Sequence, residues 1–148
     1  MPLFSAKLDY ALRAAVDLAL QPSDQPIQSR EIAARQNIRG PYLDQILAVL
    51  KREGIVRSIR GAGGGYALAR SASRITVGEV VRAVVGDQLL LGGGGTADPG
   101  TGGASYVVRK FEEEVEHNLE SVLDDCTIAD LAARQHQLED TMSIMPGI

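Results

Sequence analysis

Residues 30–70 constrain the fold most, because two short helical patterns are followed there by two short strand patterns. The first helical pattern ends in a polar turn, and the second opens at Gly40 and Pro41. A proline suits the first turn of a helix, where its missing N–H would have no partner. Two runs of strand-forming residues, 55–59 and 66–68, then flank the glycine-rich turn 60–65. This order predicts a winged helix-turn-helix, in a chain that is mainly α with a small β-hairpin wing.

Charge is distributed unevenly along the chain, although the net charge is only −4. Residues 1–75 hold 11 Lys and Arg against 6 Asp and Glu, whereas residues 76–148 hold 4 against 13. A basic half favours an anionic partner, and the helix-turn-helix order makes double-stranded DNA the favoured one. Aromatic residues are only 4% of the chain, so a stacking platform for single strands is not expected.

The helix over residues 41–52 is the predicted recognition helix, because the N-terminal residues of this element usually enter the major groove. Tyr42 and Gln45 lie one turn apart, and we expect both to face outward from the apolar positions. A glutamine can pair with an adenine edge, and a tyrosine can reach a phosphate or a thymine methyl group. Arg39, just before the helix, is placed for a phosphate contact.

The glycine-rich turn could belong to either of two kinds of site. A dinucleotide or phosphate-binding loop must lead from a strand into a helix, whereas this turn joins two strands. A hairpin wing is therefore favoured, with Arg60 entering the minor groove and the backbone close to phosphate. The residues predicted to contact DNA are Arg39, Tyr42, Gln45, Arg57, Arg60, Gly61, Gly63, Gly64 and Gly65.

The same residues carry a resemblance to a known family. The wing sequence VRSIRGAGGGY at 56–66, with Tyr42-Leu43, Gln45-Ile46-Leu47 and Tyr10-Ala11-Leu12, resembles the Rrf-two family of winged-helix transcriptional regulators. That family includes an iron–sulphur cluster regulator, a nitric-oxide sensor and a cysteine-metabolism repressor. The resemblance covers most of the chain and implies a homodimeric DNA-binding regulator that holds a palindromic operator.

The loop after the winged domain departs from the cluster-binding members of that family. Those members place three cysteines in this loop and at the start of the next helix, with a fourth ligand of another type. Here residues 86–103 contain no Cys, His or Glu, and Tyr106 and Arg109 stand near two of the family's ligand positions. Because an iron–sulphur cluster needs several thiolates, we predict none at the usual site, and we predict no other cofactor or metal.

A long helix is predicted over residues 106–123, with an apolar stripe and many glutamates on its other faces. The resemblance makes it the dimerisation helix of the family, packed against the partner subunit. The alternative is a helix folded onto its own domain, but little chain remains to cover the stripe, which favours the dimer. The stripe consists of Val107, Phe111, Val115, Leu119 and Val122.

Two further residues leave alternatives open. His117 lies one turn after Glu113 and could bind a metal, although a single histidine among carboxylates is more often a surface residue. Cys126 precedes a helix start at Thr127, which would favour a redox-sensing thiolate. The neighbouring aspartates oppose that shift, so a small buried hydrophobe is the favoured interpretation of Cys126.

The chain therefore divides into four parts. We predict a winged helix-turn-helix DNA-binding domain over residues 1–86, a flexible Gly-rich loop over 87–104, the dimerisation helix and a C-terminal helix over 105–140, and a tail over 141–148. No catalytic arrangement is recognisable, which argues against an enzyme. The single cysteine and the absence of an apolar run of about 20 residues lead us to expect a cytoplasmic protein without a membrane segment.

A different kind of partner is also consistent with this sequence. Like the cysteine-metabolism repressor of the family, the protein could act mainly through a regulatory protein that docks on its acidic half or on its Gly-rich loop. Operator binding would then matter less than the protein contact. Salt separates the two alternatives, because DNA binding through phosphates weakens steeply as salt rises.

Overall fold

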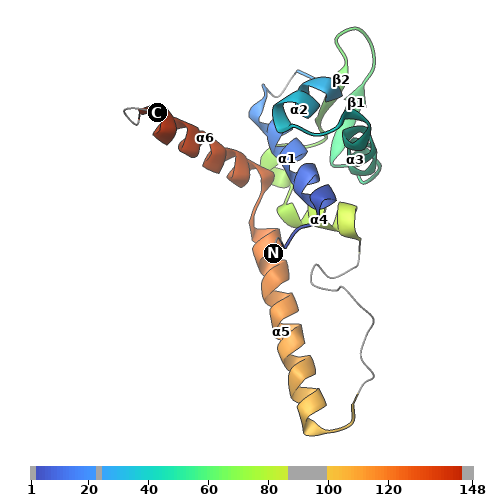
Figure 1. Ribbon diagram of the computed structural model, residues 1–148, viewed down its shortest axis with the longest axis vertical. Helices are drawn as coiled ribbons and strands as arrows, with labels where there is room; N and C mark the ends of the chain where they lie inside the picture. Colours follow the sequence, from blue (N-terminus) through green and yellow to red (C-terminus); the bar gives the residue numbers. More distant parts are fainter. Residues whose placement is uncertain (1–2, 23–24, 87–99, 145–148) are drawn as a thin grey trace.

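A computed structural model describes residues 3–22, 25–86 and 100–144 (Figure 1). Helices α1 to α4 and the hairpin form one body, and α5 and α6 extend away from it in different directions. The predicted class, mainly helical with a winged helix-turn-helix, is confirmed. The elements are α1 Ala6–Leu20, α2 Ser29–Gln36, α3 Gly40–Arg52, β1 Val56–Ile59, β2 Gly65–Leu68, a 3-10 turn η1 Ala72–Arg74, α4 Val77–Val85, α5 Gly103–Asp125 and α6 Ile128–Ile144.

The helix starts follow the capping residues of the sequence in most cases. Thr76 and Glu79 form a capping box at α4, with Oγ1 of Thr76 accepting the Glu79 N–H at 3.0 Å. At α2 the N-cap residue is Gln28. The Gln28 N–H donates to the Glu31 carboxylate at 3.3 Å, which closes the first turn of the helix.

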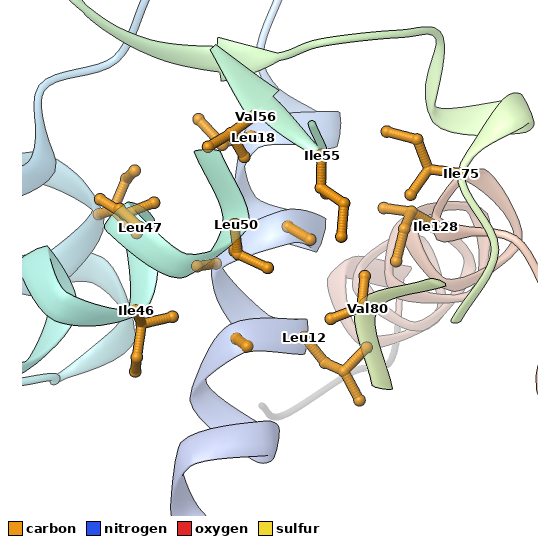
Figure 2. Close-up of a cluster of buried hydrophobic side chains, with 14 of the residues drawn as sticks. Leu12, Leu18, Ile46, Leu47, Leu50, Ile55, Val56, Ile75, Val80 and Ile128 are labelled. Atoms are coloured by element: carbon orange, nitrogen blue, oxygen red, sulfur yellow. The ribbon is translucent and has the colours of Figure 1, made fainter. Parts of the chain in front are cut away.

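The hydrophobic core lies between α1, α3, α4 and the base of the wing (Figure 2). Leu47 and Leu50 of α3 are fully buried, as is Val80 of α4. Ile128, the first residue of α6, also reaches this core, so the body includes the start of the last helix. Aliphatic side chains of this size each stabilise the fold by about 1.5–3 kcal/mol when fully buried.

The wing is a two-stranded antiparallel hairpin in which Val56 pairs with Leu68 and Ile59 with Gly65. A third segment joins it, because Ile27 pairs with Tyr66 through two backbone hydrogen bonds of 2.8 and 2.7 Å. This bridge links the segment before α2 to the wing. No pattern in the sequence predicted this bridge.

The two last helices are longer than the sequence pattern predicted. Helix α5 begins at Gly103 and ends at Asp125, and α6 continues to Ile144, so that residues 141–144 are helical rather than part of a tail. Most of the predicted Gly-rich loop, residues 87–99, lies outside the described residues. Within the described part of the chain, no helix has the length and apolar character required to cross a membrane.

Candidate nucleic-acid interface

Helix α3 separates its buried face from its exposed face as the spacing predicted. Leu43, Ile46, Leu47 and Leu50 are buried, whereas Gln45 is exposed. Arg39 is the N-cap residue, with its side chain in solvent and its carbonyl accepting the Leu43 N–H at 2.9 Å. Gln45 and Arg39 are therefore free to contact a DNA groove and its phosphates.

Tyr42 differs in part from the expectation that it faces outward. Its side chain is half-buried, and its ring meets the Tyr10 ring of α1 edge-on, with 5.7 Å between the ring centroids and an interplanar angle of 83°. The Arg13 guanidinium lies over the Tyr10 ring, 4.6 Å from its centroid. Such packing fixes the start of α3 against α1.

The arginines of the wing are exposed, and its glycines serve different purposes. Gly61 has a φ of 109°, which favours glycine, and a Cβ at Gly61 or Gly63 would meet nothing within 4 Å. A Cβ at Gly64 would meet the Ile59 carbonyl oxygen, and one at Gly65 would meet the Ile27 backbone. Gly64 and Gly65 are therefore required by the fold of the wing, whatever they contact. Arg57 and Arg60 project into solvent from this scaffold.

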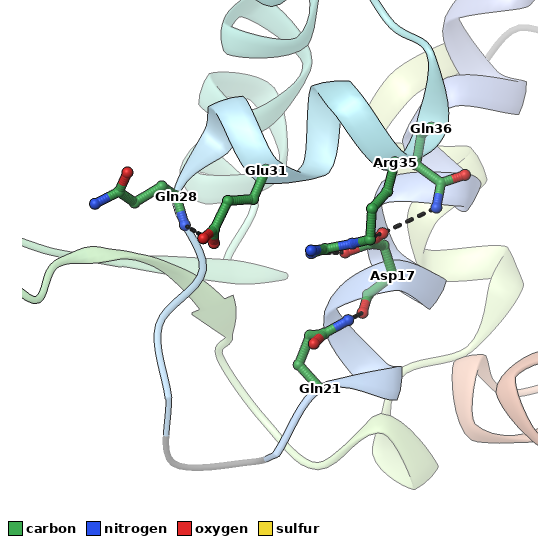
Figure 3. Close-up of polar contacts among 6 residues, drawn as sticks. All are labelled: Asp17, Gln21, Gln28, Glu31, Arg35 and Gln36. Carbon is green, nitrogen blue, oxygen red and sulfur yellow. Dashed lines mark hydrogen bonds and ion pairs between the residues drawn. The ribbon is translucent and has the colours of Figure 1, made fainter.

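A polar cluster behind the helix-turn-helix was not found from the sequence. Asp17 of α1 is 2% exposed and is the buried charged residue of the described chain. It accepts hydrogen bonds from the Arg35 and Gln36 side chains of α2 (Figure 3). The hydrogen bond to Asp17 raises the pKa of the Arg35 guanidinium above its usual value. The feature of the sequence that could have indicated this cluster is the position of Asp17, an acidic residue on a helix face that otherwise buries apolar side chains.

The predicted dimerisation stripe is uncovered in the single chain. Val107, Phe111 and Val122 of α5 are 64, 63 and 68% exposed. Val115 and Leu119 are half-exposed, and α5 buries no residue within the described chain. A row of large apolar side chains in solvent is typical of a surface that another protein covers.

The junction between α5 and α6 is attached to α4. The Val77 N–H donates to the Cys126 carbonyl at 2.8 Å, and the Arg82 guanidinium contacts both Asp124 oxygens at 2.8 Å. The hydrogen bond that Arg82 donates to the Asp124 carboxylate also raises the pKa of Arg82. The Cys126 backbone therefore has a structural role, because its carbonyl accepts the Val77 N–H. The Cys126 side chain is half-buried, with Sγ 3.7 Å from the Thr127 carbonyl oxygen.

Comparison with known proteins identifies the family. Residues 4–134 match the family model of Rrf2, which is described as "Iron-dependent Transcriptional regulator". The chain belongs to the Rrf2 family. Its resemblance to the Rrf-two regulators is thus confirmed, and the protein is a DNA-binding transcriptional regulator of the Rrf2 type.

Relatives and solved structures agree with the Rrf2 assignment. The HTH-type transcriptional regulator IscR of Klebsiella pneumoniae is 35% identical over 147 residues, which cover 91% of this chain and 88% of IscR. A Synechocystis protein, slr0846, is 45% identical over 80 residues, or 54% of either chain. The structure of CymR, the global cysteine regulator of B. subtilis, has a TM-score of 0.77 at 29% identity over 90% of this chain and 98% of CymR. T. potens IscR has a TM-score of 0.69 at 35% identity, over 98 and 93%.

Because the Rrf2 family is described as iron-dependent, we asked whether the side chains of this protein could bind iron or an iron–sulphur cluster. An iron–sulphur cluster uses several cysteines, and the whole sequence contains one. That residue, Cys126, and Tyr106 lie at opposite ends of α5, about 30 Å apart along the helix axis. In residues 3–22, 25–86 and 100–144, no group of three His, Cys, Asp or Glu side chains could hold a metal ion. The donor groups therefore do not fit a thiolate-held cluster.

Proposed function

We propose that this Rrf2 protein binds a palindromic operator as a homodimer, with α3 in the major groove and the wing in the minor groove, and without an iron–sulphur cluster at the usual site of the family. The observation that carries the proposal is the exposed Gln45 of α3 with exposed arginines on either side of it in the chain. These are Arg39 before α3 and Arg57 and Arg60 in the wing.

Electrostatics support the DNA-contacting role of these arginines. Among the described residues, Arg39, Arg57 and Arg60 form no ion pair with a carboxylate. Their charge is available to phosphates, and neutralising phosphates releases counterions from DNA. Tyr42 holds the start of α3 against α1 through its contact with Tyr10. Gly61 and Gly63 let the wing backbone approach phosphate closely.

The exposed stripe of α5 supports the dimer. Two copies of the stripe, packed around a two-fold axis, would bury Phe111 and Val122 of each chain. Two-fold symmetry in the protein is matched by a palindromic operator, because each half-site meets one copy of α3. The acidic residues of α5 stay at the margin of such an interface, where they keep the dimer soluble.

The test is sequence-selective binding by the metal-free protein. Fluorescence anisotropy would compare DNA from its own upstream region with scrambled DNA of equal length. We expect the unmodified protein to bind its upstream DNA selectively. Gln45→Ala should lower the discrimination against a wrong base, at one base pair of each half-site, by about 1–3 kcal/mol. Arg60→Ala should weaken binding to every sequence and lower the salt slope by about one per wing.

Two controls make the outcome decisive. Arg134→Ala removes an exposed arginine of α6, remote in sequence from α3 and the wing, and should leave both affinities unchanged. Sedimentation of each variant would show whether the dimer persists. Weak binding without sequence preference would contradict the proposal and favour the alternative in which a regulatory protein, a metal at His117 or oxidation of Cys126 is required.

A further inference from the structure

Helix α2 has little apolar surface to hold it in place. Of its eight residues only Ile32 is buried, and Ala33 packs at the edge of the core. In a helix-turn-helix this first helix supports the recognition helix, so its position determines where α3 lies. Something other than hydrophobic burial must therefore fix α2.

A polar clamp, formed by Asp17, Arg35 and Gln36, fixes the C-terminal end of α2 to α1 (Figure 3). The two Asp17 oxygens accept hydrogen bonds from Arg35 Nη2 at 2.7 Å and Arg35 Nε at 2.9 Å, and Gln36 Nε2 donates to Asp17 at 2.9 Å. A two-pronged contact between guanidinium and carboxylate fixes orientation as well as distance. Because Asp17 is 2% exposed, water screens this contact poorly.

The clamp lies directly before the recognition helix. The Gln36 carbonyl accepts a hydrogen bond from Arg13 Nη1 at 3.0 Å, so α1 holds this residue by its backbone as well as by its side chain. Asn37 follows in the left-handed conformation with a φ of 54°, and Arg39 is the N-cap of α3. Only two residues separate Gln36 from this N-cap.

The other end of α2 is tied to the wing. Ile27 pairs with Tyr66 through two backbone hydrogen bonds, and Gly65 lies against the Ile27 backbone. Helix α2 thus connects the wing at one end with the clamp at the other. A shift of α2 at the clamp would move α3 relative to the wing.

We propose that Asp17 is a positioning residue for operator recognition, which holds α2 through Arg35 and Gln36 and thereby sets the placement of α3 in the major groove. This inference rests on the proposed function of α3. Contacts to base edges are directional hydrogen bonds, and they weaken when their donors move by a fraction of an ångström to one ångström. Contacts to phosphates from long arginine side chains tolerate such shifts. The clamp therefore acts on sequence selectivity more than on affinity for DNA in general.

The test uses Asp17→Asn, Arg35→Gln and the double variant in the full-length protein. Anisotropy would give the ratio of operator to scrambled-DNA affinity, at a temperature well below the unfolding midpoint of each variant. We expect each single variant to lose about tenfold or more in this ratio, the cost of a misread base pair. The salt slope should stay constant because no phosphate contact is removed. Asp140→Asn, the same change at an exposed position of α6 that is remote in sequence from the clamp, α3 and the wing, should leave the ratio unchanged.

The double variant tests whether the residues act as one unit. If they do, the double variant loses no more selectivity than either single variant. Additive losses, or an unchanged ratio in a folded single variant, would overturn the proposal. If Asp17→Asn does not fold, Arg35→Gln still decides, because the Arg35 side chain is 41% exposed and tolerates replacement. Absence of selective binding by the unmodified protein would instead contradict the proposed function and is seen before any variant is made.

Discussion

The four glycines of the wing, Gly61, Gly63, Gly64 and Gly65, are not equivalent. Gly63 borders open space, whereas a methyl group at Gly65 would collide with the backbone of Ile27, and the φ of Gly65 is 150°. Two physical constraints thus coincide at Gly65, a backbone conformation that favours glycine and a close approach by another strand. A glycine-rich sequence alone does not distinguish these positions from one another.

We expect Gly65→Ala to destabilise the protein by about 1–3 kcal/mol, because the bridge between Ile27 and Tyr66 must move apart. Urea unfolding would measure this loss. Gly63→Ala is the matched control and should change the free energy of unfolding by less than about 0.5 kcal/mol. Equal effects of the two substitutions would contradict this account of the wing.

Asp130 caps the start of α6 and makes the stability of this helix depend on pH. Its carboxylate accepts the Thr127 N–H at 2.9 Å, and this hydrogen bond lowers the pKa of Asp130. The lowered pKa means that the contribution to stability is present above about pH 4, the unfolded value, and is lost as the pH falls through the folded value. Thermal unfolding from pH 6 to pH 3 should therefore show a difference in stability between wild type and Asp130→Ala that shrinks as the pH falls.

Residue roles could be predicted from the sequence where they depend on near neighbours in the chain. The capping pairs at Thr76 and Thr127 are separated by three residues from their partners and follow from spacing. The role of Asp17 could not be predicted, because its partner Arg35 is 18 residues away. Spacing places an acidic residue on a helix face, but it does not tell which distant side chain will meet it there.

At the scale of elements, α5 differs from every other helix because none of its residues is buried. The apolar stripe was predictable from its period, and so was the approximate extent of the helix. The extension of α6 to Ile144 was not, because its last turns are polar on most sides and its apolar residues are widely spaced. The partial burial of Tyr42 depends on a contact between two helices and also needed the structure.

Replacement of Phe111 tests the dimer. Phe111→Gln removes a side chain that is 63% exposed in the single chain and, on our proposal, buried by the partner. Because burial of a phenylalanine contributes about 1.5–3 kcal/mol, we expect the dissociation constant of the dimer to rise tenfold or more. Sedimentation equilibrium would measure it. Glu113→Gln, on the opposite side of α5, should leave the mass unchanged, and an unaltered dimer in Phe111→Gln would rule out this stripe as the interface.

At the scale of the whole molecule, the basic and acidic halves separate two kinds of association. Arg39, Arg57 and Arg60 of two chains would bring about six cationic side chains to the DNA, whether to phosphates or into the minor groove. Release of the matching counterions predicts a slope of roughly −5 for the logarithm of operator affinity against the logarithm of salt. The dimer contact is apolar and should respond little to salt over the same range. Anisotropy and sedimentation in one salt series would test both, and a flat slope for operator binding would contradict the role of these arginines.

The α5–α6 junction is attached to helix α4, the same element from which the chain leaves the DNA-binding body. The chain leaves α4 after Val85 and returns to it at Asp124, which pairs with Arg82. The two ends of the segment between these residues are therefore anchored side by side, at Arg82 and Asp124. The length and sequence of this segment can therefore change during evolution without remodelling the DNA-binding body.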